Sequence, residues 1–281
     1  MNESAASIQV VQFPDLIPTA LLFAITIIVM LVFIEIGFRL GSRPQDKIIK
    51  AQSTQVRAIM GVTLGLLAFM LAFTFATAQS HFEIRVANLA EEARQAHNAF
   101  LHADLLDEPH RTQARKLLRT YIGERIALER ITETDQWGEV LTIVKNSENL
   151  QRELWDIGLA NERDNRAADQ NRLQRSPFMV SVVGIIDIHN FRLQAELANR
   201  ISWVVWVTLN LTALLGMLIT GYHAGLIGRR SPIATFSLAI AFSAVMMLIT
   251  DLDRPMTSMF KISDQSLVIL AANMDEMLLS D

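Results

Sequence analysis

Side chains that could bind a metal ion gather in the middle of the chain: His81, His97, His102, His110, Glu92 and Asp104. Imidazole nitrogens and carboxylate oxygens are ordinary ligands of zinc and related metals. His97 and His102 are five positions apart, so they lie on different faces of a helix. Solvated histidines are therefore the favoured interpretation and a metal site is the alternative. We predict no metal and no cofactor.

A second group of charges follows the last apolar run, in the sequence Asp251, Asp253, Arg254 and Pro255. Two carboxylates at this place could form a cation site together with partner chains. They could instead form an ion pair with Arg254, which is the favoured interpretation. Glu35 and Arg39 form a comparable i,i+4 pair at the end of the first apolar run, where an interfacial ion pair is expected. A functional intramembrane carboxylate is the alternative for Glu35.

Catalytic motifs are missing from the sequence. It contains no glycine-rich phosphate loop, no HExxH and no nucleophile elbow. It has no cysteine, which excludes disulfides, thiolate metal sites and cysteine nucleophiles. The net charge of −4 argues against nucleic acid as a partner. We predict that the protein is not an enzyme, with a membrane enzyme as the weakest alternative.

The elements that position these residues are four long apolar runs: 16–40, 58–78, 201–221 and 233–250. Each approaches the roughly 20 residues that an α-helix needs to cross a bilayer. The pattern predicts an all-α membrane protein with four transmembrane helices and a long helical extramembrane domain between spans two and three. The expected segments are 1–15 (N-terminal segment), 16–78 (spans one and two), 79–200 (extramembrane domain), 201–250 (spans three and four) and 251–281 (tail).

Good helix formers without glycine or proline fill residues 79–106, so span two is expected to continue into water as one helix. Further helices are expected at 110–131 and 137–158. The densely charged segment at 161–175 that follows is expected to be either an exposed extension or a helix–helix connection. A helix that starts at Ser176-Pro177 is predicted to run directly into span three. Residues 264–279 are expected to form a small amphipathic helix.

Span two has two noteworthy faces. Small residues recur on one narrow face, where another helix backbone can approach closely: Gly61, Gly65, Ala68, Ala72 and Ala76. Larger side chains occupy the other faces: Leu66, Phe69, Met70, Phe73 and Thr77. These aromatics could face lipid or neighbouring spans. They could also surround a hydrophobic constriction in an oligomer, which is a known way to gate a pore.

Lysine and arginine in short loops indicate orientation, because cytoplasmic loops carry an excess of them. The two short loops together hold seven basic residues and one acidic residue, Asp46. The tail after Thr250 holds two basic and six acidic residues. The rule predicts a multi-pass membrane protein with the large domain and both termini outside the cytoplasm.

Several of these stretches together resemble the bestrophin-like family of bacterial membrane proteins, over about 61–270 of the chain. They are the run from Gly65 to Phe75, Glu91-Glu92-Ala93, Leu105-Leu106, Pro109, the run from Leu117 to Tyr121, the run from Gly221 to Arg230, and Asp251-Leu-Asp-Arg-Pro255. True bestrophins are more distant relatives, and they are pentameric, mostly anion-selective channels. Their second span lines the pore with a hydrophobic neck, and helical extensions form a second chamber.

The resemblance implies a pentamer with Phe69 and Phe73 near the neck, next to Leu66, Met70 and Thr77. It also implies a location in the bacterial inner (plasma) membrane and a permeating ion, with an anion as the first expectation. Calcium-regulated bestrophins add an acidic clasp after the last span, and this chain has no long acidic run there. True bestrophins keep the large domain in the cytoplasm, whereas the loop charges here favour the outside.

Two functions remain open at this stage. The first is a homo-oligomeric ion channel in which span two lines the pore, embedded in the lipid bilayer. The second is a non-conducting membrane scaffold or sensor whose charged helical domain binds a partner protein. An oligomer with a central pore favours the first function, and a stable partner without such a pore favours the second.

Overall fold

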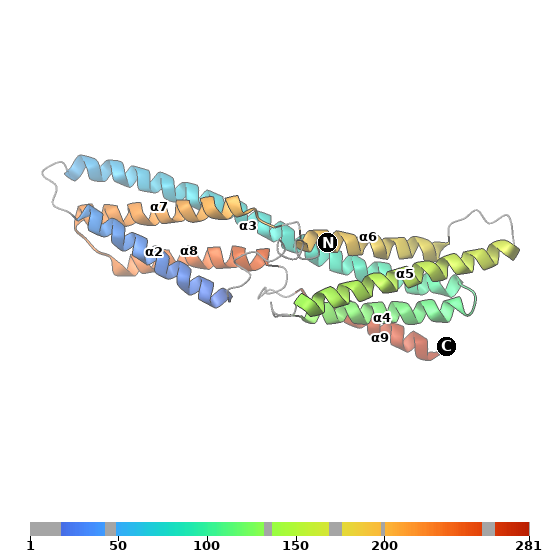
Figure 1. The fold of residues 1–281 in the computed structure, drawn as a ribbon. Coiled ribbons are helices and arrows are strands. Elements are labelled where there is room, and N and C mark those ends of the chain that lie inside the picture. Colours follow the sequence, from blue (N-terminus) through green and yellow to red (C-terminus); the bar gives the residue numbers. More distant parts are fainter. Residues whose placement is uncertain are drawn as a thin grey trace. The chain divides into compact units, whose positions relative to one another are not determined.

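A computed structural model describes residues 18–42, 49–131, 137–168, 176–197, 200–254 and 262–280. The described residues are almost entirely helical and contain no strand. The helices are α2 (Thr19–Gly41), α3 (Ile49–His102), α4 (His110–Arg130), α5 (Trp137–Ala168), α6 (Pro177–Leu197), α7 (Trp203–Ile227), α8 (Pro232–Asp253) and α9 (Gln265–Ser280), with a short 3-10 turn at Ala103–Leu105 (Figure 1). The predicted all-α fold is confirmed.

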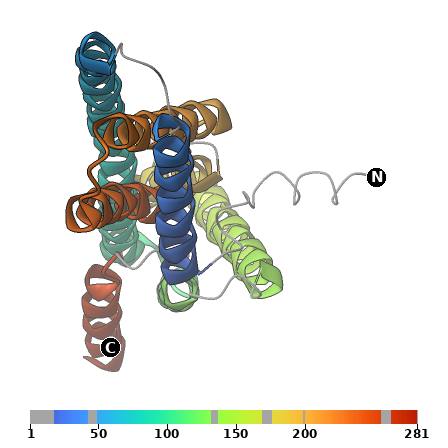
Figure 2. The same cartoon turned by 90° about the vertical axis from the view of Figure 1, so that its left-hand side faces the viewer.

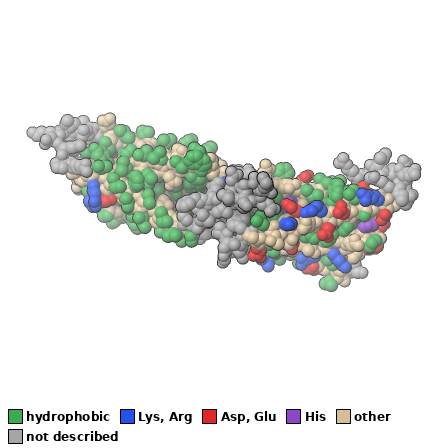
Figure 3. All heavy atoms as spheres, viewed as in Figure 1, with side chains coloured by type: hydrophobic (Ala, Val, Ile, Leu, Met, Phe, Trp, Pro, Cys, Tyr) green, Lys and Arg blue, Asp and Glu red, His purple; other side chains and the backbone are tan. Residues whose placement is uncertain are grey.

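Four of the helices are long and apolar enough to cross a membrane: α2, α3, α7 and α8. They coincide with the four apolar runs of the sequence. The chain divides into two compact units, of which unit 1 holds residues 1–82 and 200–258 and unit 2 holds residues 83–199 and 259–281. On the face shown in Figure 3, hydrophobic side chains dominate the described part of unit 1, whereas charged side chains are spread over unit 2. Unit 1 therefore contains the candidate membrane spans.

Unit 1 is built around a very close contact between α2 and α7, with α8 also packed on α2 (Figures 1 and 2). A Cβ added to Gly37 would lie 2.0 Å from the Leu218 carbonyl oxygen, and one added to Gly221 would lie 1.9 Å from the Ile34 carbonyl oxygen. Gly41 and Gly225 are equally tight against the facing backbone. Both pairs have the spacing of a GxxxG motif, which lets two helix backbones touch in a membrane.

The first part of α3 packs in unit 1 through side chains instead. Only one face of it is buried, and that face consists of Leu67, Leu71, Thr74 and Ala78. These residues join a core formed by α2, α7 and α8. The opposite side of α3 has no covering residue among the described parts of unit 1, and this is where most of the predicted site residues lie.

Unit 2 packs the second part of α3 against α4, α5, α6 and α9. Its core includes Phe100, Leu118, Leu154, Val182 and Met274, which come from five different helices. The expected C-terminal amphipathic helix is present as α9. It is joined to α4 by a bidentate ion pair between Arg119 and Asp275 at 2.6 and 2.7 Å. Asp264, the residue before α9, forms a second ion pair with Arg130 of α4 at 3.3 Å.

Two helix ends differ from the sequence-based expectation. The helix predicted at 137–158 continues to Ala168. Gly158 does not end it, because this glycine serves packing: a Cβ there would lie 2.1 Å from the Met179 sulfur of α6. The prediction of one continuous helix from 177 into span three is also wrong, because α6 ends at Leu197 and α7 starts only at Trp203. The Ile201 amide in the break donates to the Asp253 carboxylate at 3.0 Å.

The glycine contact can be tested with Gly37→Ala and Gly221→Ala. Each added methyl group would collide with a backbone carbonyl that cannot rotate away, so we expect a loss of about 1–3 kcal/mol of stability, typical of overpacking. Thermal unfolding in detergent measures the loss. The matched control is Gly123→Ala, whose Cβ meets nothing closer than an Arg119 side-chain nitrogen at 3.7 Å. A control that loses as much stability as Gly221→Ala would contradict the packing argument.

Candidate functional site

The large side chains predicted to line a pore are mostly exposed on α3. Phe69 is 70% exposed, Phe73 is 68% exposed and Leu66 is 52% exposed. Met70 is half-buried against α7, where the Thr212 hydroxyl lies 3.9 Å from its sulfur. The Thr77 hydroxyl donates to the Phe73 carbonyl of its own helix at 3.1 Å. Leu66, Phe69 and Phe73 therefore form an apolar face that no described residue of unit 1 covers.

The predicted small-residue stripe is also exposed: Gly61, Gly65, Ala68, Ala72 and Ala76. A Cβ added at Gly61 or Gly65 would meet nothing within 4 Å. Close helix approach within unit 1 takes place at Gly37, Gly41, Gly221 and Gly225 instead, which the sequence analysis did not single out. Their GxxxG spacing was the signal that could have identified them. Packing of the α3 stripe against another helix stays a prediction.

The charges after the last span form a buried cluster. Asp251, Asp253 and Arg254 are at most 2% exposed. Besides binding the Ile201 amide, the Asp253 carboxylate lies 3.8 Å from the Arg200 Nε atom, and Arg254 donates to the Thr19 hydroxyl at 3.0 Å. Arg200 and Thr19 are partners that sequence reasoning missed, because they are far away along the chain. Pro255 lies outside the described residues.

These contacts tie together the start of α2, the start of α7 and the end of α8. Burying a charge costs free energy unless the charge has partners. The cluster therefore fixes the positions of these three helix termini relative to one another. The arrangement supplies a rigid, ion-paired layer at one end of the candidate spans. The open question of a cation site shared with partner chains is not decided by contacts within one chain.

The other end of the spans carries an exposed ion-pair group. Arg39 donates to Glu35 at 2.9 Å, as the i,i+4 spacing predicted. Arg230, from the segment before α8, approaches Glu35 at 3.6 Å and stacks over the Phe38 ring at 3.9 Å. The predicted interfacial pair is therefore confirmed as a contact and extended by a third residue.

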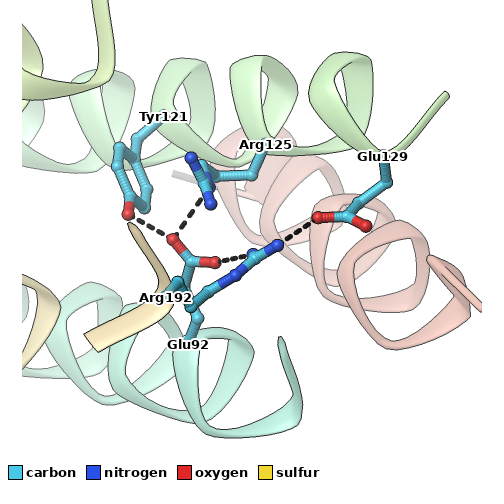
Figure 4. A network of polar contacts seen from close by, with 5 residues as sticks. All are labelled: Glu92, Tyr121, Arg125, Glu129 and Arg192. Atoms are coloured by element: carbon cyan, nitrogen blue, oxygen red, sulfur yellow. Dashed lines mark hydrogen bonds and ion pairs between the residues drawn. The ribbon is translucent and has the colours of Figure 1, made fainter. Parts of the chain in front are cut away.

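Unit 2 contains a fully buried carboxylate, Glu92 of α3 (Figure 4). Tyr121 donates to one of its oxygens at 2.5 Å, and the Arg125 Nε atom lies 2.8 Å from the same oxygen. Arg192 of α6 donates to the other oxygen and also pairs with Glu129. The network joins α3, α4 and α6 through charges that balance one another, two carboxylates against two guanidinium groups.

The pKa of Glu92 reflects two opposing effects. Burial alone would raise it, but the charges of Arg125 and Arg192 and hydrogen bonds from Tyr121 and Arg192 lower it to about 2. The carboxylate is therefore ionised at any physiological pH. The same surroundings act on the neighbouring His189, where burial and the positive charge of Arg125 lower the pKa to about 4.

The alternative of a metal site receives no support from these positions. Glu92 is enclosed by Tyr121 and arginines, and Asp104 pairs with Arg115 at 3.2 Å. His102 shares a hydrogen bond with Ser181 at 2.8 Å. Across the described residues, no three histidine or carboxylate side chains come together as a metal site requires.

The comparison with protein families decides the identity. The sequence model of the bestrophin-like domain family matches residues 22–267, which is most of the chain. The chain belongs to the bestrophin-like family. Comparison with curated proteins and with solved structures gave no significant match. Membership in the bestrophin-like family confirms the resemblance seen in the sequence, and it points to ion channels rather than enzymes.

Replacing Glu92 tests whether its network holds unit 2 together. Glu92→Gln leaves Arg125 without its carboxylate partner and Arg192 with only Glu129, and we expect a loss of about 3–5 kcal/mol. Because the pKa of Glu92 is lowered on folding, its contribution is present above pH 4.5 and is lost as the pH falls towards about 2. Thermal unfolding followed against pH should show this acid-dependent loss in the wild type but not in Glu92→Gln.

The matched control is Glu91→Gln on the adjacent position. Glu91 pairs with Arg94 on the surface at 2.5 Å, and exposed pairs of this kind contribute at most about 1 kcal/mol. The network argument is wrong if Glu91→Gln destabilises the protein as much as Glu92→Gln does.

Proposed function

We propose that the protein is a homo-oligomeric ion channel in which α3 lines the pore. The exposed face of α3 in unit 1 is the observation that carries the proposal. Two phenylalanines one helical turn apart, Phe69 and Phe73, are both about two-thirds exposed in a single chain. Ring-like assembly of identical chains would bring these side chains together as a hydrophobic neck.

The composition of this face supports contact with sister chains over contact with lipid. Exposed positions of α2 and α8 carry large aliphatic or aromatic side chains, such as Leu21, Ile28, Ile233 and Phe236. The exposed stripe of α3 carries glycine and alanine, whose small side chains offer little apolar surface for contact with lipid. Small residues favour close approach of another helix, and in a symmetric ring that helix belongs to the neighbouring chain.

The angular arrangement on α3 suits a ring. At about 100° per residue, Phe69 and Phe73 lie about a quarter turn from the small-residue stripe. The buried face, with Leu67 and Leu71, lies on the opposite side of the helix. One face can therefore contact the protomer's own α7, a second can contact the neighbour, and a third can face the axis. Met70 and Thr77 lie between the axis face and α7.

Five subunits are the number that the family resemblance implies, and an anion is the ion it implies. An apolar neck has no charge preference of its own, so selectivity depends on charged groups elsewhere along the pathway. No catalytic constellation competes with this function in the described residues. A non-conducting scaffold or sensor is the alternative outcome of the tests below.

Phe73→Ala should raise the conductance or the open probability severalfold, because it removes a large apolar side chain from the constriction. Single-channel recording in planar bilayers measures the effect, and native mass spectrometry gives the subunit number. The control is Phe236→Ala on α8, which removes an exposed phenylalanine that would face lipid and should leave the currents unchanged. A well-folded ring that carries no current in the wild type or in Phe73→Ala would favour the scaffold function.

We further propose that the channel lies in the plasma membrane with unit 2 outside the cytoplasm, as the short basic loops favour. Arg39 and Arg230 lie at the loop end of the spans and carry part of this charge. Alkaline phosphatase fused after Asp281 should be active, and a cytoplasmic fluorescent protein at the same place should be dark. Fluorescence without phosphatase activity would reverse the orientation and leave the channel proposal untouched.

A further inference from the structure

A groove of about 570 Å³ lies between α5 and α6 in unit 2 and has no part in the proposed pore. Five of its lining residues recur on one face of α5, and three come from one face of α6. They are Glu148, Gln151, Arg152, Trp155, Asp156, Ile186, His189 and Asn190. The groove thus has a floor of buried residues and a rim of exposed ones.

The floor holds a buried polar side chain without a partner. His189 is 2% exposed, and neither ring nitrogen has a hydrogen bond to any described residue. Gln151 lies beside it and is 5% exposed. Burying the imidazole without a hydrogen bond costs free energy, so its place on the floor of an open groove indicates an occupant that bonds to it.

The protonation state of His189 defines what the floor can bind. Its pKa is lowered to about 4 by burial and by the nearby charges of Arg125 and Arg192. Those two arginines are balanced by Glu92 and Glu129. Near neutral pH the imidazole is therefore uncharged, and one of its nitrogens offers a lone pair as an acceptor.

The rim adds two carboxylates. The carboxylates of Glu148 and Asp156 are exposed and have no hydrogen bond or ion pair with any described residue, whereas the Glu148 backbone carbonyl accepts from the Arg152 Nε atom at 3.4 Å. They are eight positions apart on α5, which corresponds to about 12 Å along a helix. Arg152 lies between them in sequence, but its guanidinium donates to the Asn149 side chain at 2.6 Å. Trp155 lies beside Asp156 and presents a partly exposed indole, a surface that attracts cations.

We propose that this groove binds a linear aliphatic di- or polyamine. Its ammonium groups would pair with Glu148 and Asp156, its methylene chain would lie on Trp155 and Ile186, and an N–H group would donate to the lone pair of His189. An anion is disfavoured by the two rim carboxylates, and a neutral ligand would leave both of them unused. The proposal does not depend on whether the protein conducts ions.

Isothermal titration calorimetry of the full-length protein in detergent, with spermidine as the probe at low salt, tests the site. We expect saturable binding that weakens by about tenfold in the double variant Glu148→Gln, Asp156→Asn, because two exposed ion pairs are lost. Both side chains are exposed, so the fold should be retained. Glu153→Gln removes another exposed carboxylate of α5 outside the groove and should leave the affinity unchanged.

A second measurement reports on the floor. The ring resonance of His189, identified by its absence in His189→Asn, should shift when spermidine is added to the wild type. A diol of equal chain length should neither bind nor move this resonance. The proposal is overturned if spermidine gives no heat, if the diol binds equally, or if Glu153→Gln weakens binding as much as the double variant does.

Discussion

Four glycines hold α2 and α7 so close that their backbones touch, and the rest of unit 1 follows from this contact. Gly37 and Gly41 face the α7 backbone, and Gly221 and Gly225 face that of α2. In lipid, apolar side chains gain little from leaving one apolar surface for another, so helix association relies on such close van der Waals packing. Because α2 and α7 pack against each other and α8 packs on α2, no described helix of unit 1 covers one side of α3.

Buried charged side chains occupy different positions in the two units. In unit 1 the buried charges lie at the helix ends, where Asp253 meets Arg200 and the amide of Ile201. In unit 2 a carboxylate lies in the middle of the core, where Glu92 is shared by Arg125 and Arg192. Glu92 has partners from α4 and α6, and Asp253 has partners just before α7, so each network specifies which segments meet.

Much of the fold could be predicted because apolar run length and helix breakers are local properties. The span at 58–78 was visible from its apolar length, and its continuation was visible from the absence of glycine and proline over 79–106. The break at 200–202 was not, because it depends on a carboxylate more than fifty positions later. The predicted helix end at 158 was wrong for a similar reason, because Gly158 lies inside α5 and makes room for Met179 of α6.

The sequence by itself determined four membrane-length helices, an all-helical domain between them and the family, since these depend on composition and local spacing. Only the tertiary structure decided which glycines make the close contact, which side of α3 stays open and which one of two adjacent glutamates is buried. Glu91 and Glu92 look alike along the chain, yet α4 and α6 enclose only Glu92. The physical reason is that burial and charge pairing arise between segments distant in sequence, and no local pattern encodes that distance.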